Sequence, residues 1–166
     1  MTLEALNRLD AAAFIEAVGW VFEETPWVAE RVADARPFGD LAGLHSAMVR
    51  QVENAAPSEQ LALLRAHPDL GTRARLSEAS NAEQAGAGLD SLSPEELELF
   101  TTRNESYKAK FGFPFVFAVK GSTKHDIIRA LGQRLASDRE TESAEALRQV
   151  YQIAAFRLHE YLGSGA

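Results

Sequence analysis

The stretch KFGFPFVFAVKG, residues 110–121, is the one part of this sequence whose composition favours a β-strand, because aromatic and β-branched residues are common in strands. Pro114 and the two glycines argue against a central strand, since proline cannot donate to a sheet ladder. No second strand candidate is available to pair with it. We therefore expect a buried connector, irregular or briefly helical, whose backbone polar groups need partners other than a ladder. A ligand is one such partner.

On both sides of this stretch the apolar residues recur at helical spacing. Ser93, followed by Pro94 and Glu96, is a capping box, the clearest helix start. The last helix is expected over about 143–162. Further start signals, each an N-cap residue before apolar residues at helical spacing, are Asp10, Thr25, Asp40 and Thr123. The sequence predicts an all-α fold of about seven to nine helices without a sheet, in one domain over residues 1–166.

Composition limits the classes of function. The net charge of −7 over 166 residues, with no basic run, argues against nucleic-acid binding. The absence of cysteine excludes thiolate nucleophiles and zinc–thiolate sites, and fits a cytoplasmic location. No apolar run approaches the roughly 18 residues of a membrane span. We therefore expect no membrane partner. The four histidines form no close ligand pair, so we also expect no metal site.

The motif RAHPDLG, Arg65–Gly71, ends a helix at a histidine, because Pro68 disfavours the helical conformation of His67. Two interpretations are open. His67 is a cap on the protein surface, since cations suit helix C-termini, or it is a proton donor.

Two further residues are candidates for chemistry. Ser80 and Glu83 stand in capping-box register, and a capping role would leave the carboxylate able to face a pocket. Arg157 lies near the centre of the apolar arc of the last helix. An arginine there pairs with a buried carboxylate, binds a ligand's carboxylate, or extends its head group to an edge of the arc.

Several motifs in this order, HPDLG, SxxEQ with AGL, NxxYxxKFGFPFV and a late FRL, resemble the 2-oxo-4-hydroxy-4-carboxy-5-ureidoimidazoline (OHCU) decarboxylase family over nearly the whole chain. The resemblance implies an all-α carboxy-lyase without cofactor or metal, usually a homodimer. Such an enzyme forms (S)-allantoin in the last step of urate oxidation. One departure is Lys120, where many relatives have arginine.

The resemblance places the family's catalytic histidine, glutamate and arginine at His67, Glu83 and Arg157, which we expect to converge on one pocket. His67 would be the general acid, favoured as imidazolium by the helix C-terminus. Arg157 would bind substrate oxygens through a forked contact, and Glu83 would accept hydrogen bonds from the substrate. The expected substrate-binding residues are Pro68, Ser80, Asn81, Ala82, Glu83, Gln84, Phe115, Val116, Phe117, Ala118 and Val119.

Two other interpretations compete with an enzyme. A helical binding module for a urate-derived ligand or a protein would keep Arg157 but would not need an acid at His67. A scaffold domain would satisfy Arg157 internally, for example through Glu83.

Overall fold

The computed structural model describes residues 1–71 and 77–163, and every regular element in these ranges is helical. Because these residues contain no strand, the predicted all-α fold is confirmed. None of the helices in the two ranges has the length and hydrophobicity of a membrane span. The elements are α1 Leu3–Asn7, α2 Ala11–Val18, α3 Trp27–Val32, the 3₁₀ helix η1 Ala33–Ala35, α4 Leu41–Glu53, α5 Pro57–Arg65, α6 Glu78–Gly86, α7 Pro94–Phe111, α8 Lys124–Leu135 and α9 Arg139–Leu162.

Local capping signals place most of the helix starts. The Asp10 and Asp40 side chains accept from backbone N–H groups in the first turns of α2 and α4. Ser93 and Glu96 form the predicted capping box at α7. Thr123 caps α8, again as expected. These starts depend on one turn of sequence, which is why they can be predicted without tertiary information.

The starts of α3 and α9 differ from the prediction. The last helix begins at Arg139 rather than near residue 143, because Asp138 accepts hydrogen bonds from the backbone N–H and the hydroxyl of Thr141. Pro26 rather than Thr25 is the N-cap of α3. The Thr25 hydroxyl instead donates to the Glu23 carbonyl, 2.7 Å away, within the turn before the helix.

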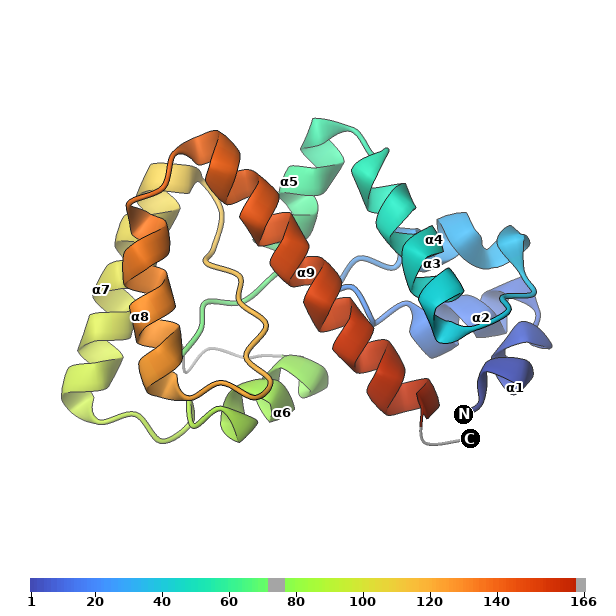
Figure 1. Cartoon of the computed structure of the whole chain (residues 1–166), viewed down its shortest axis with the longest axis horizontal. Coiled ribbons are helices and arrows are strands. Elements are labelled where there is room, and N and C mark those ends of the chain that lie inside the picture. Colours follow the sequence, from blue (N-terminus) through green and yellow to red (C-terminus); the bar gives the residue numbers. More distant parts are fainter. Residues whose placement is uncertain (72–76, 164–166) are drawn as a thin grey trace. The chain divides into compact units, whose positions relative to one another are not determined.

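The chain forms two compact units, Met1–Ala66 with Tyr151–Ala166 and His67–Val150. The helix α9, orange to red in Figure 1, supplies residues to both. The predicted single domain over residues 1–166, of which 72–76 and 164–166 lie outside the described residues, stays a prediction. Large buried side chains of the first unit are Leu6, Phe14, Phe22, Leu44, Met48 and Leu63, and those of the second are Phe100, Tyr107, Phe111, Phe115, Ile127 and Leu131.

The stretch 110–121 is the irregular connector that its proline and its two glycines predicted. Helix α7 ends at Phe111, and Gly112 adopts the left-handed conformation (φ 82°) that follows many helices. The chain then continues without helix or strand as far as α8, as Figure 1 shows. The Tyr107 ring contacts three phenylalanine rings of this region, those of Phe111, Phe113 and Phe115, at centroid distances of 4.6, 5.9 and 5.5 Å. Aromatic packing thus replaces a ladder as the source of order.

Candidate active site

His67 follows directly on the C-terminal end of α5, and only 8% of its surface is exposed. The position is the one that Pro68 predicts, since proline disfavours a further helical residue before it. The burial contradicts the interpretation of His67 as a cap on the surface. The role of His67 as a proton donor stays a prediction.

The four residues after His67 are held by side chains of α6 and α7. The Gly71 backbone N–H donates to Gln84 Oε1 at 3.0 Å, and the Leu70 carbonyl accepts from Asn104 Nδ2 at 2.8 Å. Both side chains are buried. Gly71 has a left-handed backbone (φ 72°), which disfavours any other residue there. The loop that carries His67 is therefore fixed to α6, the helix that carries Glu83.

Helix α6 presents the predicted binding residues on two different faces. Ser77 is the N-cap and accepts from the Ser80 backbone N–H, so the capping box expected at Ser80 and Glu83 is wrong. Ser80 and Gln84 are buried and Glu83 is half-buried, which agrees with their position on one side of a helix. Asn81 and Ala82 are exposed on the other side. Glu83 is thus on the face that also holds the His67 loop.

The segment Phe115–Val119 is almost wholly buried, although it belongs to no ladder. Two of its backbone groups are bound by side chains: the Val116 carbonyl accepts from Arg134, and the Ala118 N–H donates to Gln149. The N–H groups of Phe117 and Val119 hydrogen-bond to no described residue. Phe117 is half-buried and Val119 buried, and backbone donors that no ladder satisfies are suited to a ligand.

Arg134, Glu142 and Tyr107 form a buried network of polar contacts next to this segment. The Arg134 guanidinium donates through Nε to Glu142 Oε1 at 2.6 Å and lies 4.5 Å above the Phe115 ring. Its Nη2 atom is 2.5 Å from the same oxygen, an ion-pair contact without hydrogen-bond alignment. The Tyr107 hydroxyl also donates to Glu142. Burial, and then this hydrogen bond, raise the pKa of Tyr107 well above its usual value, so the phenol stays protonated.

Arg157 belongs to the other unit and pairs with a carboxylate that sequence reasoning missed. Its Nη2 donates to Glu23 Oε2 at 2.8 Å, and both residues are 3% exposed. Its Nη1 lies 3.3 and 3.4 Å from the carbonyls of Trp20 and Val21. The apolar arc on α9 left three interpretations open, and of these the structure shows pairing with a buried carboxylate. Nothing in the sequence distinguishes Glu23 among the 24 acidic residues. The convergence of Arg157 with His67 and Glu83 stays a prediction.

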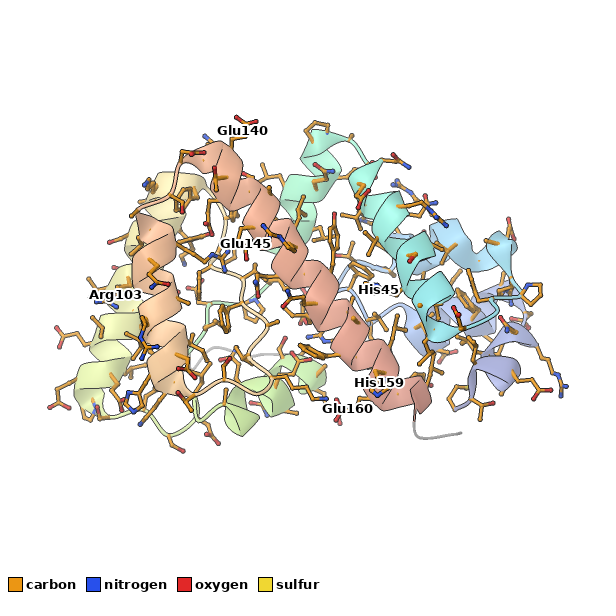
Figure 2. All side chains as sticks on the ribbon, viewed as in Figure 1. His45, Arg103, Glu140, Glu145, His159 and Glu160 are labelled. Carbon is orange, nitrogen blue, oxygen red and sulfur yellow. The ribbon has the colours of Figure 1, made fainter. Side chains whose placement is uncertain are left out.

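The remaining histidines are not among the residues predicted for the site. His45 Nε2 lies 2.8 Å from the Tyr151 carbonyl, whereas His125 and His159 are exposed; Figure 2 labels His45 and His159. In the described parts of the chain, no three His, Asp or Glu side chains come together as metal ligands.

The comparison with known proteins gives the family. A family model described as OHCU decarboxylase matches residues 7–159. The chain belongs to the OHCU decarboxylase family. The matched range contains His67, Glu83 and Arg157.

The alignments with these relatives span almost the whole length of this chain. The 2-oxo-4-hydroxy-4-carboxy-5-ureidoimidazoline decarboxylase of Haloferax volcanii is 48% identical over 99% of this chain and 98% of that protein. The uric acid degradation bifunctional protein of Bacillus subtilis is 45% identical over 97% of this chain and 33% of that protein. A crystal structure of (S)-allantoin synthase is similar with a TM-score of 0.80 at 33% identity, and the match covers 98% of this chain and 54% of that one.

Proposed function

We propose that this protein decarboxylates OHCU to (S)-allantoin, the last step of urate oxidation, with His67 as the general acid. The observation that carries the proposal is the family match over residues 7–159, together with 48% identity to a named decarboxylase along almost the entire length of both chains. The burial of His67 at the end of α5 supports its part in the chemistry.

The substrate itself provides the electron sink. Its carboxylate is attached to a ring carbon next to a C=N bond, so the pair released when the C–C bond breaks and CO₂ leaves is delocalised into the imine. One proton must then be added to carbon, and its face of addition sets the S configuration. The protein has to orient the substrate, exclude water and deliver that proton. We expect it to do so without a cofactor.

His67 is suited to deliver the proton. The partial negative charge at the C-terminus of α5 favours the imidazolium form, which is a competent acid near neutral pH. Hydrogen bonds from the Leu70–Gly71 backbone to α6 and α7 hold the loop that carries the ring. An acid fixed in this way protonates one face of a bound intermediate, whereas protonation from bulk water would give both enantiomers.

Glu83 and Arg157 are proposed to orient the substrate. Glu83, on the inward face of α6, would accept hydrogen bonds from the hydroxyl or the ureido N–H groups. Arg157 would bind substrate oxygens through its planar guanidinium, whose direction is fixed by the 2.8 Å contact with Glu23. The backbone of Phe115–Val119 and the α6 residues Ser80–Gln84, with Pro68, would complete the binding surface.

Freshly prepared substrate tests the proposal, because OHCU also decays without a catalyst. We expect its ultraviolet absorbance to disappear faster with the protein than without it, and circular dichroism to show (S)-allantoin in excess. A protein that binds product but does not accelerate the decay would be a binding module, the competing interpretation. The absence of both acceleration and enantiomeric excess would refute a decarboxylase.

The homodimer implied by the resemblance is part of the proposal, as is the cytoplasmic location. Light scattering on a size-exclusion column distinguishes a monomer of 18.1 kDa from a species of twice that mass. A monomer at micromolar concentration with full activity would refute the dimer as the functional state.

A further inference from the structure

The proposed substrate-binding segment is anchored at two backbone atoms by side chains of different helices. From α8, Arg134 Nη1 donates to the Val116 carbonyl at 2.5 Å. From α9, Gln149 Oε1 accepts from the Ala118 N–H at 2.9 Å. A segment without a ladder has no regular partner that fixes the rotation of its peptide groups. These two contacts fix it.

Gln149 is itself oriented by a neighbour. Its Nε2 donates to Glu145 Oε1 at 2.8 Å, one turn earlier on α9, where Figure 2 labels Glu145. Because the amide nitrogen is bound to a carboxylate, the amide oxygen is the atom that faces Ala118. The helical spacing puts Gln149 on the polar side of α9, where a helix needs no particular residue. The bond to Ala118 is therefore a specific feature and not a requirement of the helix.

The two anchors determine what Phe117 presents. A peptide unit is planar and trans, so its C=O and N–H point in opposite directions. Holding the Val116 carbonyl toward Arg134 turns the Phe117 N–H away from that side chain. Holding the Ala118 N–H toward Gln149 likewise turns the Phe117 carbonyl away from Gln149. Within the described residues neither Phe117 group has a hydrogen-bond partner. Phe117 thus offers one donor and one acceptor in fixed directions.

We propose that Gln149 and Arg134 are positioning residues for substrate binding, because they hold the Phe117 backbone donor and acceptor for the amide groups of the substrate. The inference rests on the proposed function. A ureido group or a ring amide presents N–H next to C=O, which is the complement of what Phe117 offers. Neither positioning residue needs to touch the substrate.

Gln149 carries the test, because it is half-buried, whereas the buried Arg134–Glu142 pair also contributes to stability. The Gln149→Leu variant lacks the oxygen that accepts from the Ala118 N–H, while its side chain has a size similar to that of glutamine. We expect KM to rise about 3- to 10-fold, the equivalent of one hydrogen bond, with kcat within about twofold. The matched control is Gln152→Leu, an exposed glutamine on the same helix without a described hydrogen-bond partner, whose KM should not change.

An exchanged pair provides the rescue. Glu145→Gln together with Gln149→Glu restores both contacts, since the new amide donates to the new carboxylate, which accepts from Ala118. We expect KM to return to within about twofold of wild type, although the exposed Arg148–Glu145 ion pair is lost. Amide hydrogen exchange at Ala118 should be faster in Gln149→Leu and slow again in the exchanged pair.

Three results would overturn the inference while the wild type remains active: an unchanged KM in Gln149→Leu, an equal rise in Gln152→Leu, or a folded exchanged pair that does not recover. An inactive wild type would instead refute the proposed function, and the exchange rate at Ala118 would still show whether the anchor exists.

Discussion

Replacing Glu23 by alanine should leave the Arg157 guanidinium charged in a site where each residue is only 3% exposed. Removing one partner of a buried pair typically costs about 3–5 kcal/mol, because the remaining charge loses its counter-ion at a site shielded from water. The hydrogen bonds from Arg157 Nη1 to two carbonyls, at 3.3 and 3.4 Å, are too long to replace a carboxylate. At roughly 2–4 °C per kcal/mol for a chain of this size, the melting temperature should fall by about 6–20 °C.

The double variant Glu23→Leu with Arg157→Met separates stability from chemistry. It removes both charges and keeps the volume, and buried pairs replaced in this way are often as stable as the original. Two carbonyls, those of Trp20 and Val21, lose a donor, so we expect recovery of more than half of the loss rather than all of it. If Arg157 binds the substrate, turnover should still be lower by about 10²-fold or more, the usual effect of removing a charged group from a reacting site.

Thermal melts and the formation of (S)-allantoin from fresh substrate measure the two effects on the same samples. The control is Glu59→Ala, because the Arg31–Glu59 pair is more than one-third exposed, so this variant should lose little stability beyond the hydrogen bond that Glu59 accepts from the Ala56 backbone N–H at the start of α5. A double variant that melts near the wild type and retains its turnover would show that Arg157 is structural. A Glu23→Ala protein as stable as Glu59→Ala would refute the calculation of the burial cost.

Three further predictions use single variants. His67→Asn should lower turnover about 10²–10⁴-fold and abolish the enantiomeric excess. Because the ring is buried, the variant should also lose about 1–3 kcal/mol of stability. An active variant that still forms one enantiomer would exclude His67 as the acid. Glu96, whose pKa is lowered from 4.5 to about 2 by a lysine hydrogen bond and by the helix cap, should stabilise the fold above about pH 4.5 and lose this contribution as the pH falls toward 2. The difference in urea midpoint between wild type and Glu96→Gln should shrink over that range, and a constant difference would contradict the assigned cause. Gly71→Ala should destabilise the fold by about 1–3 kcal/mol, because φ is 72° and a Cβ would lie 3.0 Å from a leucine methyl. Gly86→Ala, on the open surface of a helix, should not destabilise it. Equal urea midpoints for the two variants would contradict this.

Features that depend on a few adjacent residues could be predicted from the sequence. The capping box at Ser93 and the helix end before Pro68 follow from local backbone chemistry. The irregular course of residues 110–121 follows from proline and glycine in a segment with strand-like composition. The error at α6 was also local. Ser77 and Ser80 both precede helical residues, and the pattern at Ser80 and Glu83 matched a capping box although Ser77 makes the cap.

Features that depend on distant partners could not be predicted in the same way. The arc on α9 left open whether Arg157 pairs with a buried carboxylate, binds a ligand or extends to an edge. Its partner Glu23 is 134 residues away and stands beside a second glutamate. Helical spacing places Gln149 on the polar side of α9, and only the fold shows the Ala118 N–H within 2.9 Å of it. Burial of His67 likewise depends on how the loop after α5 is fixed to α6 and α7.

Arg134 and Arg157 are both buried and have the same kind of partner, but we expect them to have different tasks. Stability alone does not require a charged pair at either place, since apolar residues of equal volume often recover most of the loss. Arg134 has a structural task that the contacts already explain, because it binds Glu142 and a backbone carbonyl that has no ladder partner. Removing that pair should therefore weaken substrate binding through the position of Phe117. The contacts of Arg157 with Glu23 fix its direction without explaining why a charge is needed there. Removing that pair should act on turnover, so comparison of KM and kcat for the two double replacements distinguishes an arginine that shapes the site from one that acts in it.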